Sequence, residues 1–71
     1  MRINPEALKA IREMSGMTKA DLSRAAQIDR TTITRLESGE RNGTPAQLRD
    51  LAIALGVPTQ AITINDVEVA A

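Results

Sequence analysis

The sequence has no cysteine, no histidine and no aromatic residue among its 71 residues. The lack of cysteine excludes a disulfide scaffold, a Cys-ligated zinc site and thiol chemistry. The lack of histidine removes the commonest general base and metal ligand. Apolar residues make up 42% of the chain, and all of them are Ala, Ile, Leu, Met or Val. The core must therefore be small and aliphatic.

Positive and negative side chains are equal in number, because nine Lys and Arg balance nine Asp and Glu. This balance argues against binding of a polyanion through bulk charge alone. Asp66 and Glu68 lie in the last seven residues, so residues 1–64 carry a net charge of +2. A local basic face is therefore compatible with the composition.

Long apolar runs are missing too: none approaches the roughly 20 residues of a membrane span, and the N-terminus has no signal-peptide apolar region. We therefore expect a cytoplasmic protein with no membrane partner. No residues show the spacing of a nucleophile and its base or of a set of metal ligands. A single domain of this length is near the lower limit for independent folding. We expect no enzyme activity, no metal, no cofactor and no small-molecule ligand.

What the sequence does contain is a series of helix start and stop signals. Helix starts are indicated by Asn4 before Pro5, by Thr18, by Asp29, and by Thr44 before Pro45. Glycines 16, 39 and 56 indicate helix ends. These signals predict five short helices, over residues 5–14, 19–26, 30–38, 45–55 and, as a last turn, 58–62.

Helical spacing then predicts which residues face inward. The set is Ala7, Leu8, Ile11, Met14, Leu22, Ala25, Ala26, Ile33, Leu36, Leu48, Leu51, Ala52 and Leu55. Residues 31–34 are four β-branched residues in a row, which by themselves favour a strand. We predict a helix there, because Ile28 and Ile33 flank the Asp29 cap as a hydrophobic staple.

Two short helices joined by a tight turn, over residues 19–38, describe a helix-turn-helix, although an ordinary helical hairpin has the same topology. The outward face of the second helix separates these interpretations. It carries hydrogen-bonding side chains without an apolar intruder, which favours recognition of DNA over a merely solvated face. These residues are Arg30, Thr31, Thr34, Arg35 and Ser38.

Residues 17–22 (MTKADL) and 28–39 (IDRTTITRLESG) resemble the helix-turn-helix of the Cro and lambda-type repressor (XRE) family. The resemblance extends to residues 8–12 and to the segment 48–57, which ends in LAIALGV, and covers roughly residues 5–62. It implies an all-α, five-helix lambda-repressor-like bundle that lays its third helix in the major groove of double-stranded DNA. It also implies that the chain binds as a homodimer.

The resemblance also implies roles for individual residues. Lys19 matches a position that contacts the DNA backbone. Arg35 matches a position that contacts a base or a phosphate. The remaining matches are Arg30, Thr31 and Thr32 in the first turn of the recognition helix, and Ser38, Arg41 and Asn42 in the stretch that binds phosphates. Arg12 and Glu37 match a partly buried ion pair that belongs to the scaffold.

Two residues depart from the family pattern. Gln27 stands in the turn where the family usually has Gly, which costs roughly 1 kcal/mol if the residue is left-handed. Ser23 stands where the family usually has Ala, between the two helices.

We assign residues 1–64 to a DNA-binding domain and 65–71 to a tail. Residues 62–69 alternate as a strand does, so they are open to three interpretations. They form a hairpin around Asn65 and Asp66, donate a strand to a dimer partner, or fray.

The sequence therefore predicts a sequence-specific transcriptional repressor, similar to phage Cro or immunity repressors, that acts as a dimer on an operator. A DNA-binding antitoxin of a toxin–antitoxin pair has the same fold. A helical interaction module that does not bind DNA is the alternative from another class.

Overall fold

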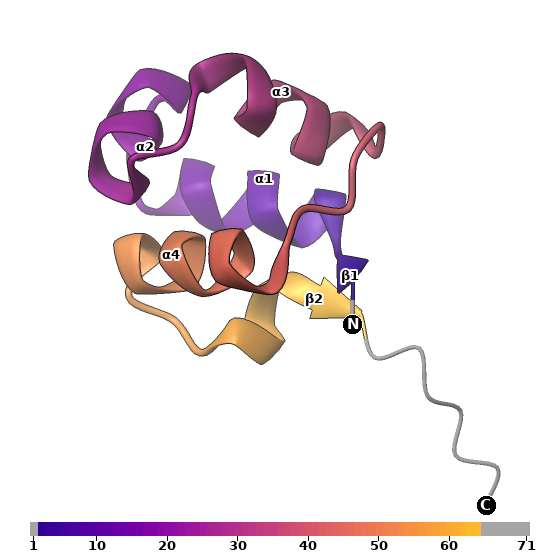
Figure 1. The fold of residues 1–71 in the computed structure, drawn as a ribbon. Coiled ribbons are helices and arrows are strands. Elements are labelled where there is room, and N and C mark those ends of the chain that lie inside the picture. The colour runs from indigo at the N-terminus through magenta and orange to yellow at the C-terminus, as the bar shows by residue number, and fades with distance from the viewer. Residues whose placement is uncertain (1, 65–71) are drawn as a thin grey trace, which may run out of the picture.

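The computed structural model describes residues 2–64 and consists mainly of four α-helices. These are α1 (Pro5–Met14), α2 (Lys19–Ala26), α3 (Arg30–Ser38) and α4 (Pro45–Leu55). In Figure 1, α3 lies at the top, α1 crosses behind the middle, α4 lies below, and α2 closes one side. The four helix ranges agree with those predicted from the sequence.

Side-chain caps explain why the helices begin where they do. The Asn4 side chain accepts a hydrogen bond from the Ala7 N–H at 3.2 Å. Thr18 and Thr44 each form a capping box, in which the cap hydroxyl and the side chain three residues later satisfy each other's backbone N–H groups. The Asp29 carboxylate accepts from two N–H groups of the first turn of α3. All four predicted starts are confirmed.

Left-handed residues end α2, α3 and α4. Gly39 and Gly56 have φ angles of 85° and 72°. The Val57 N–H donates to the Ala52 carbonyl at 3.0 Å, which is the bond of a Schellman motif. At the end of α2 the left-handed residue is Gln27, with φ 58° and ψ 43°.

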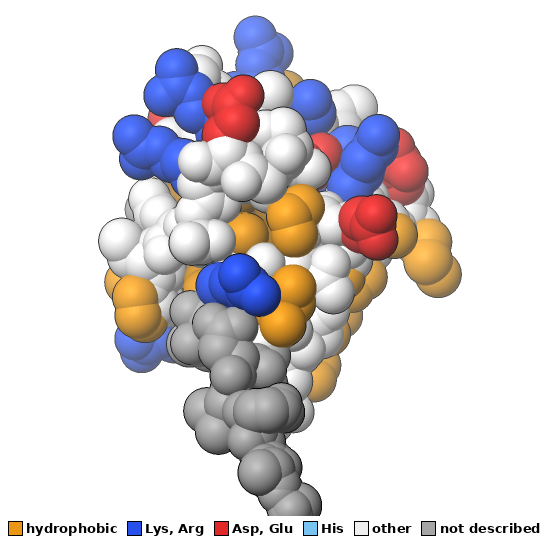
Figure 2. All heavy atoms as spheres, turned by 90° about the vertical axis from the view of Figure 1, so that its right-hand side faces the viewer, with side chains coloured by type: hydrophobic (Ala, Val, Ile, Leu, Met, Phe, Trp, Pro, Cys, Tyr) orange, Lys and Arg blue, Asp and Glu red, His pale blue; other side chains and the backbone are white. Residues whose placement is uncertain are grey.

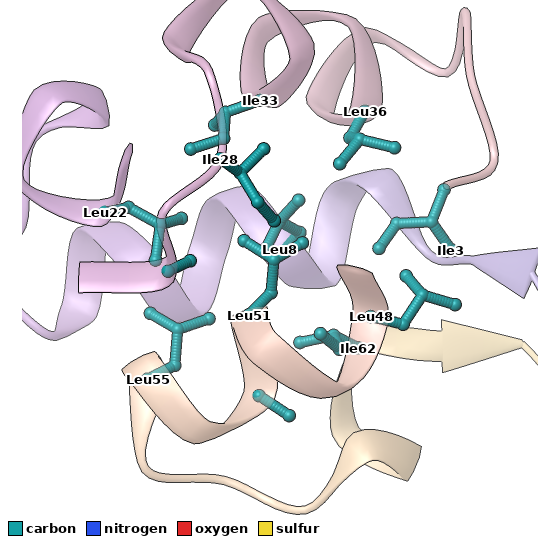
Figure 3. Close-up of a cluster of buried hydrophobic side chains, with 12 residues drawn as sticks. Ile3, Leu8, Leu22, Ile28, Ile33, Leu36, Leu48, Leu51, Leu55 and Ile62 are labelled. Carbon is teal, nitrogen blue, oxygen red and sulfur yellow. The ribbon is translucent and has the colours of Figure 1, made fainter. Parts of the chain in front are cut away.

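The core lies between the four helices and contains only aliphatic side chains (Figure 3). Its large members with almost no exposed surface are Ile3, Leu8, Leu22, Ile33, Leu36, Leu48, Leu51 and Ile62.

Two residues predicted to face inward do not. Met14 is 85% exposed, and Ala25 is exposed as well. On α1 the buried residues are Leu8 and Arg12. Since each helical residue turns by about 100°, Met14 points about 200° away from Arg12. Ala25 is exposed because Leu22 and Ala26 take the inward positions of α2.

The prediction of a fifth α-helix is wrong. The segment η1 (Thr59–Ile62) is a single 3₁₀ turn, and no side chain caps it. Four residues after Pro58 are too few for an α-helix, and Ile62 at the end of the turn is drawn into the core.

A short antiparallel sheet joins the two ends of the described chain, so the fold is not purely helical. Strand β1 (Arg2–Ile3) pairs with β2 (Thr63–Ile64), with Arg2 opposite Ile64 and Ile3 opposite Thr63. The Asn4 N–H extends the pairing through a bond of 2.8 Å to the Ile62 carbonyl. Strand β2 thus pairs with the chain's own N-terminus, and the predicted hairpin around Asn65 and Asp66 lies outside the described residues. No helix of residues 2–64 is long and apolar enough to cross a membrane.

Candidate nucleic-acid interface

Both residues that depart from the family pattern lie at the turn between α2 and α3. Gln27 is left-handed, so the expected local strain is present. The Ile28 N–H donates to the Ser23 carbonyl at 3.1 Å. The Ser23 hydroxyl donates to the Ile28 carbonyl at 2.6 Å. Ser23 therefore closes the turn with two hydrogen bonds to Ile28, and this fixes the start of α3 relative to α2.

The core decides which face of α3 is exposed. Ile33 and Leu36 are fully buried, so the helix is anchored on that side. The opposite face is left to solvent, and it presents Arg30, Thr31, Thr34, Arg35 and Ser38, all of which are exposed. This arrangement gives an exposed polar helix face that is anchored to a packed core.

The other predicted contact residues surround this face. Arg41 and Asn42 are exposed in the loop that follows α3. Lys19, the first residue of α2, and Thr32 are half-buried. Among the predicted DNA-contact residues, the structure brings Lys19, Thr34 and Ser38 together around one shallow depression.

A buried ion pair ties α1 to α3 directly beneath this surface. Arg12 donates from Nε to Glu37 Oε2 at 2.7 Å and from Nη2 to Glu37 Oε1 at 3.1 Å. The side chains of Arg12 and Glu37 are only 8% and 5% exposed. The third donor, Arg12 Nη1, reaches the Met17 carbonyl at 2.9 Å. The hydrogen bond to Glu37 raises the pKa of Arg12, so the guanidinium stays charged.

Two acidic residues, the exposed Glu40 and the half-buried Asp21, lie beside basic residues of the surface. Glu40 Oε1 lies 3.8 Å from Arg35 Nε. The loop brings it there because the N–H groups of Glu40 and Arg41 both donate to the Arg35 carbonyl. Asp21 Oδ1 lies 2.8 Å from Arg24 Nη2. The Arg35–Glu40 contact was not predicted from the sequence, although the glycine stop at Gly39 between the two residues is a signal that the chain folds back.

Asp21 is held in its charged form by its capping role. The Thr18 backbone N–H donates to its carboxylate at 3.0 Å and lowers the pKa of Asp21. A second contribution comes from the Thr18 hydroxyl, and a smaller one from Arg24.

Figure 2 shows the surface from the right-hand side of Figure 1. Lys and Arg side chains gather over the upper part of the molecule, where α3 lies, with a few acidic side chains among them. The lower part shows more hydrophobic surface. Among residues 2–64, no three acidic side chains are grouped so that they can hold a metal ion.

Comparison with known proteins agrees with this geometry. The family model described as helix-turn-helix matches residues 8–62. The chain is similar to the wild-type restriction-modification controller protein C.Esp1396I, with 35% identity and a TM-score of 0.72 over 76% of this chain and 71% of that protein. The clp gene regulator ClgR from C. glutamicum is 25% identical, with a TM-score of 0.74 over 79% and 73% of the two chains.

The restriction-modification controller protein C.AhdI from Aeromonas hydrophila shares the fold, with a TM-score of 0.78 and 24% identity over 80% of this chain and 86% of that one. No curated protein sequence matches the chain. The family match covers more than half of the chain and includes α2, the turn and α3. The chain belongs to the XRE family of helix-turn-helix proteins.

Proposed function

We propose that this protein is a DNA-binding transcriptional regulator whose residues 1–64 form the binding domain. The observation that carries the proposal is the exposed polar face of α3, whose opposite side is anchored in the core by Ile33 and Leu36. The similar proteins support it, since two are restriction-modification controllers and one is a clp gene regulator.

The side chains on α3 suit the edges of base pairs. An Arg guanidinium donates two parallel hydrogen bonds to O6 and N7 of guanine, and a Thr methyl packs on the thymine methyl. Arg30 and Arg35 are exposed on α3 and supply the guanidinium groups. Thr31 and Thr34 lie between them on the same helix.

The residues around α3 suit the DNA backbone. Lys19, Ser38, Arg41 and Asn42 carry ammonium, hydroxyl, guanidinium and amide donors, which bind phosphate oxygens. Thr32 lies in the first turn of α3, where its side chain is half-buried. Because few phosphates are contacted by each subunit, we expect a shallow dependence of affinity on salt, with a slope of about −0.9 per phosphate.

One subunit reads too little DNA for useful specificity. A helix of nine residues is roughly 13 Å long and spans about four base pairs. We therefore propose a homodimer that binds two half-sites about one DNA turn apart. Occupation of such an operator obstructs polymerase, so we propose a repressor similar to phage Cro and immunity repressors, acting in the cytoplasm of a bacterial or phage-infected cell.

Selection of bound sequences from a random pool of duplex DNA tests the proposal. The full chain is expected to enrich a two-fold symmetric site with half-sites about one turn apart. Enrichment of a single half-site contradicts the dimer, and the absence of any bound DNA at low salt contradicts the function and favours an interaction module. Copurification of a toxin protein from the native host favours an antitoxin.

A further inference from the structure

A shallow depression of about 220 Å³ lies where α1, α2 and α3 meet. Its lining residues come from all three helices and are Lys9, Lys19, Thr34, Glu37 and Ser38. Lys9 belongs to α1, which the assignment of DNA contacts has left out. The depression opens beside the outward face of α3, since Thr34 and Ser38 are exposed residues of that face.

The depression carries uncompensated positive charge. Its one carboxylate, Glu37, is bound by Arg12 through two hydrogen bonds and is only 5% exposed. Within residues 2–64, neither Lys9 nor Lys19 has a carboxylate partner. The Arg12–Glu37 pair is neutral, so the two ammonium groups leave the depression with a charge of +2.

Hydroxyl groups supply the remaining wall. The Thr34 hydroxyl has no hydrogen-bond partner in the part of the chain that the structure describes. The Ser38 hydroxyl donates to the Arg35 carbonyl at 3.1 Å and can rotate toward the depression. Ammonium and hydroxyl donors around a small concave surface are suited to an oxygen-rich anion such as a phosphodiester.

We propose that Lys9 is a further DNA-binding residue and that the depression holds one backbone phosphate of the DNA strand beside α3. The inference rests on the proposed function, because the phosphate reaches the depression only when α3 docks on DNA. Lys9 of α1 and Lys19 of α2 then bind the same phosphate. The contact carries no sequence information and adds affinity on any DNA.

The test is the salt dependence of binding to the selected site, measured with Lys9→Gln and, as the matched control, Arg49→Gln. Arg49 is exposed on α4, on the other side of the core from α3 (Figure 1). Loss of one phosphate contact reduces the slope of log K against log salt by about 0.9. When the salt concentration rises from 50 mM to 200 mM, the drop in affinity of Lys9→Gln is therefore expected to be about 3.5-fold smaller than that of the wild type. At a fixed salt concentration, the substitution is expected to weaken binding to selected and scrambled DNA by the same factor.

Each other outcome overturns the inference. A wild-type slope in Lys9→Gln means that Lys9 contacts no phosphate, although the proposed function stands as long as the wild type binds its site. An equal slope change in Arg49→Gln means that only bulk charge acts. NMR titrations of the amide resonances of Thr34 and Ser38 distinguish DNA from free phosphate. If these resonances shift with inorganic phosphate but not with DNA, the depression is a site for free phosphate. A wild type that binds no DNA defeats the proposed function itself.

Discussion

Removal of the buried Glu37 carboxylate is expected to destabilise the protein more than removal of any exposed or half-buried charged side chain. The Arg12 side chain is only 8% exposed, and Glu37→Ala leaves it with the Met17 carbonyl as its remaining hydrogen-bond acceptor among residues 2–64. Breaking a buried pair in this way costs about 3–5 kcal/mol. A chain of 71 residues has a total stability of roughly 4–11 kcal/mol. The substitution therefore removes a large fraction of the free energy of unfolding.

Thermal unfolding followed by circular dichroism measures this effect. A loss of 3 kcal/mol lowers the Tm of a domain of this size by at least about 12 °C. Glu13→Ala is the matched control, because Glu13 lies 3.9 Å from the same Arg12 but its side chain is 57% exposed. Its expected cost is below about 1 kcal/mol.

The double variant Arg12→Met/Glu37→Leu distinguishes the contribution of the charges from that of side-chain packing, because it removes both charges and keeps apolar side chains in their place. Because it leaves no unpaired buried charge, it is expected to be more stable than either of its single variants, Arg12→Met and Glu37→Leu. An unchanged midpoint in Glu37→Ala, or additive losses in the double variant, would refute the reasoning.

Three further substitutions test the turn, the surface charge and the cap. Gln27→Gly relieves the left-handed strain at the end of α2, but it also increases the conformational entropy of the unfolded chain, which offsets part of the gain. We expect a net rise of the Tm by a few degrees. Gln27→Ala keeps the strain and is expected to leave the Tm unchanged. Glu40→Gln frees Arg35 and removes repulsion from phosphates, so we expect DNA affinity to rise by up to about five-fold with an unchanged melt; weaker binding would contradict this. Asp21 has a lowered pKa, so its contribution to stability is present above its unfolded pKa of 3.8 and is lost as the pH falls through the lowered value. The Tm difference between wild type and Asp21→Ala should therefore be present at pH 7 and shrink below pH 4; a difference that persists in acid would rule out the carboxylate as its source.

The helix boundaries were predictable because the signals that set them are local. Asn4, Thr18, Asp29 and Thr44 each cap a backbone N–H within three residues, so a short window of sequence contains the whole interaction. The same signals overrode the strand preference of residues 31–34. Which side of each helix faces inward depends on distant elements, and Met14 shows how an apolar residue at plausible spacing can still point to solvent.

Apart from the contact between Arg35 and Glu40, the features that could not be predicted from the residue pattern depend on distant parts of the chain. Strand β1 is extended only because β2, about 60 residues later, supplies its partner. The depression at Lys9 exists only where α1, α2 and α3 meet. The Arg12–Glu37 pair joins residues 25 positions apart, and it was anticipated through the family resemblance rather than from the residue pattern.

The role of α3 in reading DNA is tested most directly by the affinity of Arg30→Ala/Arg35→Ala for the selected site. Both side chains are exposed, so the melt of the double variant should stay close to that of the wild type. Each bidentate contact to guanine is worth about 1–3 kcal/mol, so we expect the double variant to lose at least about 30-fold in affinity per subunit, whereas Arg49→Ala should stay near wild type. Retention of full affinity and sequence preference by the folded double variant would contradict the role of α3 in reading DNA.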